Sequence, residues 1–133
     1  MYPHLSTLND AVIGAAGLSR SARTPGALPL IGLVPGEGVG PALTDLARDV
    51  LAALTQRTGQ AFACEDGVAI GVDAVRAHGE ALTPQAVAWF ESLFARGGAA
   101  LCGPGGARFV YDLRRRFDLF CKVSPIAVEA ALL

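Results

Sequence analysis

The sequence lacks the features that would assign it to several specialised classes of protein. Its three cysteines, Cys64, Cys102 and Cys121, lie far apart and form no C-x-x-C pair. This argues against a zinc ribbon or a redox dithiol and favours free thiols in a reducing cytoplasm. No stretch approaches the roughly 18 to 20 apolar residues that span a bilayer. The formal net charge is -1, so no overall charge attracts nucleic acid or an anionic membrane.

Side chains that bind metals or transfer protons are also sparse. The two histidines, His4 and His78, are isolated and have no evident acidic partner, so neither is expected to act as a base. The acidic residues form no cluster with the spacing of a metal site. We therefore predict no catalytic residue and no metal site in this chain.

Apolar residues, by contrast, are abundant enough to build one domain. They make up 52% of the 133 residues, slightly more than is usual for a soluble protein. Segment 11–18 is apolar, but its arginines follow it, which is the wrong order for a secretory signal. We predict an N-terminal arm at residues 1–27, ended by Pro25-Gly26, and a single cytoplasmic α/β domain at residues 28–133.

Apolar runs and helical periodicities alternate along this domain. Short apolar runs that end at glycine or proline are typical of buried strands. Apolar side chains at spacings of three and four, as in residues 41–57, are typical of one helix face. The order indicates right-handed βαβ crossovers and a small three-layer parallel sheet. The predicted strands are 28–34, 61–65, 99–102 and 119–123, the predicted helical segments are 41–57, 84–96, 111–117 and 126–133, and residues 67–82 are predicted to form a connection that contains short strands.

A glycine-rich loop, G-E-G-V-G, follows the first predicted strand and leads into the first helix. Such a loop can turn backbone N–H groups toward an anion at the positive end of a helix. Gly36, Glu37, Gly38 and Gly40 are therefore candidate cofactor-binding residues. The loop is not the dinucleotide fingerprint, because Pro41 stands where its last glycine belongs, and it is not a P-loop. A tight turn required by packing explains the same glycines at least as well, so both interpretations stay open.

This loop and four later segments resemble the N-terminal region of the isocitrate and 3-isopropylmalate dehydrogenase family of β-decarboxylating dehydrogenases. The loop is similar to the family's G-D-G-I-G-P, with Glu37 in place of the aspartate. Five matches in the family's order, over about residues 28–126, indicate common descent and imply the fold of that region. The segments are LIGLVPGEGVGP at 30–41, GVAI at 67–70, GEALTP at 79–84, AALCGPGG at 99–106, and LRRRFDLF at 113–120 followed by Pro125.

The resemblance also implies an anion site. The family's arginine after the leucine of L-R-x-x-L-D-L-Y/F binds a substrate carboxylate, and this role falls on Arg114. A guanidinium suits the role because it forks onto a carboxylate with two charge-assisted hydrogen bonds. The family's second substrate arginine is Ser124 here, and the asparagine two places earlier is Lys122, which offers a charge without the bidentate geometry. Arg114, Lys122 and Ser124 are the candidate substrate- or anion-binding residues.

Cofactors follow from the resemblance alone. The family uses NAD(P) and Mg²⁺ or Mn²⁺, bound by residues from later parts of a much longer chain, so we do not expect this chain alone to retain them. We expect a truncated relative that is not catalytic by itself and acts as an accessory subunit or an anion-binding domain. The alternative is a piece of a split or longer NAD(P)- and Mg-dependent oxidoreductase that oxidatively decarboxylates a 2-hydroxy dicarboxylate. An unrelated nucleotide-binding module built on the glycine-rich loop is a third possibility.

Partners are predicted from the sheet. In the family, strands from the C-terminal end of the chain share a sheet with the N-terminal strands, so this chain should have an exposed sheet edge. An exposed edge is a template for pairing with another chain. We therefore expect a homo-oligomer or a protein partner, and neither nucleic acid nor membrane.

Overall fold

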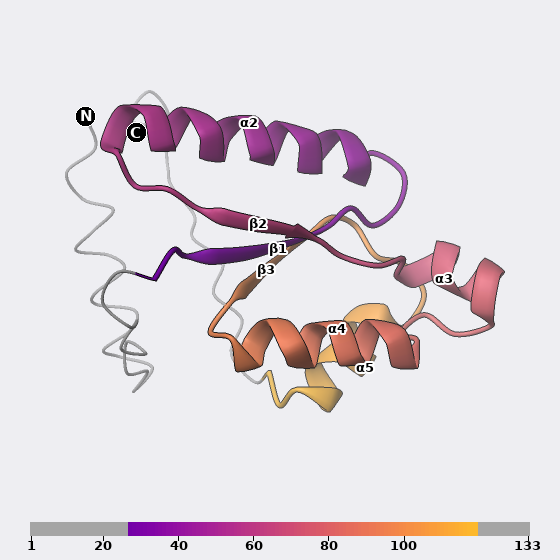
Figure 1. The fold of residues 1–133 in the computed structure, drawn as a ribbon. Coiled ribbons are helices and arrows are strands. Elements are labelled where there is room, and N and C mark those ends of the chain that lie inside the picture. Colours follow the sequence, from indigo (N-terminus) through magenta and orange to yellow (C-terminus); the bar gives the residue numbers. More distant parts are fainter. Residues whose placement is uncertain (1–26, 120–133) are drawn as a thin grey trace, which may run out of the picture.

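The computed structural model describes residues 27–119 as a three-stranded parallel sheet with helices on both faces (Figure 1). The sheet order is β2-β1-β3. Leu30 of the central strand pairs with Ala63, and Ile31 pairs with Ala99. This confirms the predicted α/β class and its parallel sheet. The strands are β1 (Leu30–Val34), β2 (Ala63–Asp66) and β3 (Ala99–Cys102).

The helices complete a three-layer arrangement. One helix covers one face of the sheet, and two helices lie against the other face (Figure 1). A short helix stands beyond the end of the sheet where the strands finish. The helix that covers the first face alone is α2 (Gly40–Thr58), and the two on the other face are α4 (Pro84–Ala95) and α5 (Phe109–Arg116). The short helix beyond the end of the sheet is α3 (Gly71–His78).

The two long helices begin and end as the sequence predicts. Pro41 lies in the first turn of α2, and Gly59 ends it in the left-handed conformation, its N–H donating to the Thr55 carbonyl. Thr83 caps α4, because its hydroxyl oxygen accepts the Ala86 N–H at 3.1 Å. The caps at Gly59 and Thr83 each form hydrogen bonds with residues only three or four positions away, which is why the sequence reveals them.

The prediction for residues 67–82 was wrong in one respect, because this connection contains the helix α3 rather than short strands. The helix lacks a local start signal. Ile70 stands at its N-cap without a side-chain hydrogen bond, and Gly71 begins it with φ of 65°. A helix capped by a distant residue leaves no trace in its own sequence.

The core lies between the sheet and the α4–α5 layer. Phe90 is fully buried and packs against four aromatic rings, with centroid distances of 5.0 Å to Trp89 and 5.8 Å to Phe94. Gly32 of β1 allows α4 to approach the sheet, since a Cβ there would lie 2.5 Å from the Trp89 ring. The buried cluster consists of Val34, Ile70, Ala81, Phe90 and Phe109.

Several predictions fall outside the described residues. These are the N-terminal arm except for residue 27, the helical tail at 126–133, and all of the fourth strand except Leu119, which is not in a strand. Within residues 27–119, no helix has both the length and the apolar character needed to cross a membrane.

Candidate functional site

The carboxyl ends of β1 and β3 meet where open α/β sheets usually bind ligands. The chain leaves β1 toward α2 on one face and leaves β3 toward α5 on the other (Figure 1). Two neighbouring strands whose connections diverge in this way form a topological switch point. The glycine-rich loop at residues 35–39 makes one side of this point, and the loop at residues 103–108 makes the other.

The two loops contact each other directly through their backbones. The N–H of Glu37 donates to the Pro104 carbonyl at 2.9 Å. A Cβ at Gly36, whose φ is 69°, would overlap the Pro104 carbonyl oxygen, and one at Gly103 would overlap that of Pro35. Only glycine tolerates both a positive φ and such an approach. Close packing therefore accounts for Gly36 without a ligand.

The Glu37 carboxylate lies at the start of α3. Its Oε2 accepts the backbone N–H of Val72 at 2.9 Å. A Cβ at Gly106 would overlap Oε1, so this glycine makes room for the carboxylate. The first turn of a helix carries unpaired N–H groups and a partial positive charge, which favour an anion. At α3 the chain supplies that anion itself.

The start of α2 retains few donors for a bound anion. The Gly40 N–H donates to the Glu37 carbonyl at 3.0 Å, Pro41 has no N–H, and the Leu43 N–H donates to Val39. Gly38 differs from its neighbours, since a Cβ there would meet nothing within 4 Å. The fold thus brings the four predicted cofactor-binding residues together, and their binding role stays a prediction.

Two acidic residues at the end of β2 are held by arginines from the flanking helices. Arg96 contacts both carboxylate oxygens of Glu65 at 2.7 Å. Arg48 of α2 pairs with Asp66. A nucleotide-binding fold would place its ribose-binding acid near this position. Here the two carboxylates link β2 to α2 and to the end of α4.

Arg114 lies in the last turn of α5 with Arg115 and Arg116. Arg116 pairs with Glu91 at 2.7 Å. Arg114 is exposed and forms no ion pair with any residue in 27–119. No acidic residue of the described part of the chain therefore neutralises its guanidinium. The other two predicted anion-binding residues, Lys122 and Ser124, lie outside the described residues.

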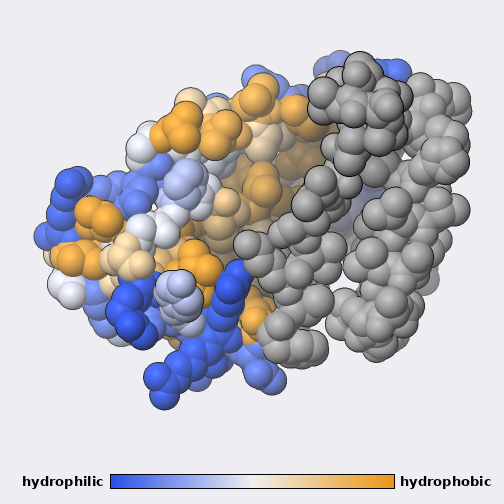
Figure 2. All heavy atoms as spheres, turned by 180° about the vertical axis from the view of Figure 1, so that it is seen from behind, coloured by the Kyte–Doolittle hydropathy of each residue, from blue (hydrophilic) through white to orange (hydrophobic). Residues whose placement is uncertain are grey.

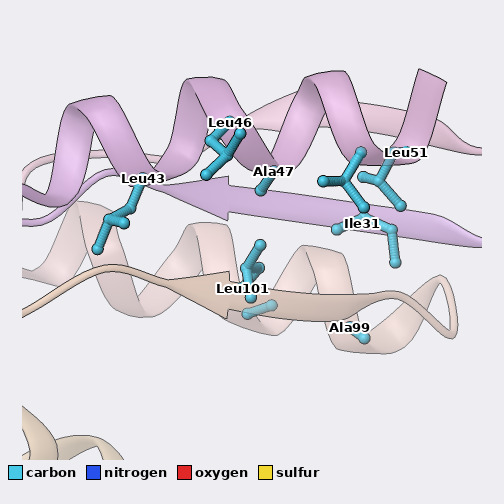
Figure 3. A pocket seen from close by; sticks show the side chains of 9 residues that line it. Ile31, Leu43, Leu46, Ala47, Leu51, Ala99 and Leu101 are labelled. Atoms are coloured by element: carbon cyan, nitrogen blue, oxygen red, sulfur yellow. The ribbon is translucent and has the colours of Figure 1, made fainter. Parts of the chain in front are cut away.

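An open apolar groove runs between α2 and the β3 side of the sheet (Figure 3). Its volume is about 520 Å³. The α2 side chains reach toward those of β1 and β3, and Figure 2 shows apolar residues at the surface around a hollow. The sequence predicts that α2 has an apolar face. It does not reveal that the described residues leave part of this face uncovered. The lining of this α2 groove consists of Ile31, Leu43, Leu46, Ala47, Val50, Leu51, Ala99, Ala100 and Leu101.

Metal-binding and thiol chemistry are limited in this part of the chain. Residues 27–119 contain no group of three His, Cys, Asp or Glu side chains that could hold a metal ion. Cys64 and Cys102 are free. Desolvation raises the pKa of the Cys102 thiol from its ordinary 9.0 to about 11, so this thiol is protonated at neutral pH and is a poor nucleophile.

The sheet order and the loop at its switch point define an open-sheet α/β domain, the architecture of many dehydrogenases. No family model matches the chain. It is 32% identical to a 3-isopropylmalate dehydrogenase of Parasynechococcus marenigrum, over 76% of this chain and 30% of that protein. It is 30% identical to one of Bacillus subtilis, over 77% and 30%, and 31% identical to one of Anaeromyxobacter dehalogenans, over 76% and 31%.

The chain belongs to the isocitrate/3-isopropylmalate dehydrogenase family. It spans about 30% of the length of the curated relatives it matches.

Proposed function

We propose that this chain binds a carboxylate at Arg114 and works within an assembly as a ligand-binding or accessory subunit that does not catalyse oxidation alone. The observation that carries the proposal is the exposed Arg114 guanidinium, which pairs with none of the described acids. It lies in a segment similar to the family's carboxylate-binding L-R-x-x-L-D-L. The relatives are named for 3-isopropylmalate, a dicarboxylate, so a small dicarboxylate is the proposed ligand.

The lack of independent catalysis is supported by what residues 27–119 contain. They offer no group of three metal-binding side chains, and Glu37 is engaged by the Val72 N–H. These residues do not form a site for Mg²⁺ or Mn²⁺ on their own. The proposed function therefore assigns no step to a metal held by these residues.

The assembly is supported by the surface of the sheet layer. Both β2 and β3 are edge strands of the described sheet, and edge strands present unpaired backbone groups. The α2 groove adds an apolar surface beside β3. The proposed setting is the cytoplasm, where reduced thiols match the free Cys64 and Cys102.

Calorimetry with 3-isopropylmalate tests the anion site. We expect Arg114→Gln to weaken binding at least tenfold, because truncating one partner of a charge pair typically costs about 2 kcal/mol or more. Arg115→Gln, one position along the same helix turn, is the matched control and should leave the affinity unchanged. Equal affinity for the Arg114→Gln and unaltered chains, with circular dichroism showing both folded, would remove Arg114 from the site.

The second candidate function is a part of a split or longer oxidoreductase that oxidatively decarboxylates a 2-hydroxy dicarboxylate. The identity to three dehydrogenases over about 30% of their length favours it. Combining this chain with a polypeptide homologous to the rest of those relatives should then give NAD(P)H production that depends on added Mg²⁺. No NAD(P)H from any 2-hydroxy dicarboxylate would dispose of this candidate and would leave the carboxylate-binding proposal standing.

A further inference from the structure

We propose that residues 11–18 of this same chain lie in the α2 groove as a short helix beside α2. They belong to the predicted N-terminal arm and are outside the described residues. This goes beyond the proposed function, because it gives the groove an occupant from within the chain. The edge strands β2 and β3 then remain as the surfaces for a partner.

The helix α2 is too narrow to cover its face of the sheet. Three strands spaced about 4.8 Å apart, with their side chains, are roughly 14 Å wide, whereas a helix with side chains is about 10 Å across. Parallel sheets are normally buried on both faces. Leu101 of β3 is nevertheless 47% exposed and points toward α2 (Figure 3). The missing cover has the width of one helix lying beside α2.

The groove requires an occupant without charge. The nine residues that line it are all uncharged, so a charged side chain buried among them would lack a partner, which is costly. Residues 11–18, AVIGAAGL, are the longest run outside residues 27–119 that has neither a charged nor a polar side chain. The apolar run at residues 126–133 is interrupted by Glu129. Residues 11–18 therefore match the groove better.

The length of this segment also matches the groove. On α2 the lining extends from Leu43 to Leu51, which is about 12 Å at roughly 1.5 Å per residue. Eight residues in a helix have the same length. Asp10 stands just before the segment, at the position of an N-cap. Gly14 and Gly17 lie on one side of such a helix and allow its backbone to approach α2 closely.

The arm joins the domain at the end of the groove. Residue 27 leads into β1, and Ile31 of β1 lines the groove together with Ala99 at the start of β3. The connection at residues 19–26 spans up to about 26 Å when extended, roughly twice the length of the groove. The described chain ends instead beyond α5, on the opposite face of the sheet (Figure 1). A C-terminal occupant would have to pass around the sheet edge.

The arginine on the same side of α2 stays in water in this arrangement. Arg57 follows Val50 by seven positions, close to two turns, so it lies on the side of the groove. It is exposed, and it is six positions beyond Leu51, roughly 9 Å past the end of the lining. A helix of eight residues does not extend over it. Arg20 and Arg23 belong to the connection rather than to the segment.

Labelling of a cysteine in the groove tests the proposal in the full 133-residue chain. Leu46→Cys falls on the tryptic peptide 24–48, which has no native cysteine, so mass spectrometry reports its reaction with iodoacetamide separately. We expect labelling at least about tenfold slower than in urea, because the segment must move away before the thiol reacts. Ala52→Cys is the control, since Ala52 is exposed on the β2 side of the same helix and should show little protection.

Matched substitutions in the arm identify what covers the cysteine. Ile13→Asp places a charge in the segment and should abolish the protection of Leu46→Cys, whereas Leu5→Asp, outside the segment, should not. Circular dichroism shows that both variants are folded. No protection at Leu46→Cys, or protection that Ile13→Asp leaves intact, overturns the proposal. So does protection that depends on protein concentration, which indicates a second copy, or that only Val128→Asp removes, which indicates the C-terminal segment.

Cross-linking locates the segment without displacing it. A short bismaleimide should join Ile13→Cys to Leu46→Cys within one chain, and it should not join Ile13→Cys to Ala52→Cys. Peptide mapping separates these links from links to the native cysteines. The linked product should keep the 13.7 kDa of one chain. A link to Ala52→Cys in place of Leu46→Cys, or a link between two chains, overturns the proposal.

These results separate the groove from the carboxylate site. Calorimetry should give the same affinity for 3-isopropylmalate in Ile13→Asp as in the unaltered chain, because Arg114 lies on α5, on the other face of the sheet. An open groove in a chain that binds 3-isopropylmalate through Arg114 overturns this inference and leaves the proposed function standing. A protected groove in a chain that does not bind it has the opposite meaning.

Discussion

Glu37 and Val72 lie 35 positions apart in the sequence and are joined by a hydrogen bond of 2.9 Å, from the Val72 N–H to Glu37 Oε2. This bond fastens the glycine-rich loop after β1 to the first turn of α3. A residue that sequence analysis treats as a candidate cofactor ligand is thus the cap of a helix that sequence analysis misses. This hydrogen bond gives Glu37 a structural role, and it gives α3 a cap that the sequence around α3 does not contain.

Removing this cap should destabilise the domain. We expect Glu37→Ala to lower the free energy of unfolding by about 1 kcal/mol, the usual cost of losing a helix cap. Glu37→Gln keeps an oxygen acceptor of the same length and should lose less. Urea denaturation of the three chains measures the difference, and equal midpoints for Glu37→Ala and the unaltered chain would mean that α3 does not depend on Glu37.

Two glycines of the loop should respond differently to alanine. Gly36 and Gly38 both have positive φ, 69° and 61°, which costs a side chain about 1 kcal/mol. At Gly36 the new Cβ would also overlap the Pro104 carbonyl oxygen, whereas at Gly38 it would meet nothing within 4 Å. In thermal unfolding, the melting temperature of Gly36→Ala should be well below that of Gly38→Ala. Similar melting temperatures for the two variants would contradict the packing role of Gly36.

Truncating the central aromatic side chain should come close to unfolding the domain. Phe90 is fully buried and lies within 6.4 Å, centroid to centroid, of four aromatic rings. Phe90→Ala is expected to cost about 3 to 5 kcal/mol, and Phe90→Leu, which keeps most of the volume, should cost less. Guanidinium denaturation measures both. A loss below about 1 kcal/mol for Phe90→Ala would place the main core elsewhere.

The Cys102 thiol should react with iodoacetamide in a way that reports its desolvation. Cys102 is an exposed residue, but desolvation of its thiol raises the pKa to about 11. Because only the thiolate reacts, its labelling should be slow at pH 8 and should accelerate up to about pH 11. In the unfolded chain the thiol regains an ordinary pKa, so labelling in urea should level off near pH 9. Stability should accordingly fall as pH rises from about 9 to 11, because the unfolded state then releases its proton first. Mass spectrometry of a chain with serine at Cys64 and Cys121 gives the rates, and a plateau near pH 9 without urea would refute the shift.

Local signals explain which predictions succeeded. Thr83 with Pro84 marks the start of α4, and Gly59 marks the end of α2, because each satisfies backbone groups within one turn of its own position. Short apolar runs identified all three strands, and their alternation with helices indicated the parallel sheet. The predicted bounds of β3 and the predicted end of β1 match the structure, whereas the start of β1 and both ends of β2 are one or two residues off. Hydrogen bonds to neighbouring strands decide where a strand begins and ends.

Long-range contacts explain what the sequence did not reveal. Glu37 accepts a hydrogen bond from the first turn of α3. The carboxylates of Glu65 and Asp66 are held by Arg96 and Arg48, 31 and 18 positions away. Partners at such separations follow only from how the elements pack. For the same reason, the sequence singled out Arg114 but could not show that its neighbour Arg116 pairs with Glu91 while Arg114 stays free of the described acids.

The sequence by itself determined the fold class, the parallel order of the elements and the family, because these depend on local apolar periodicity, on caps, and on motifs that keep their order along the chain. Only the tertiary structure decided that the loop glycines pack against residues 103–106, that Glu37 caps α3, and that the described residues leave the apolar face of α2 open. Those facts depend on the distance between segments far apart in the chain, and on how much of a sheet one helix is wide enough to cover.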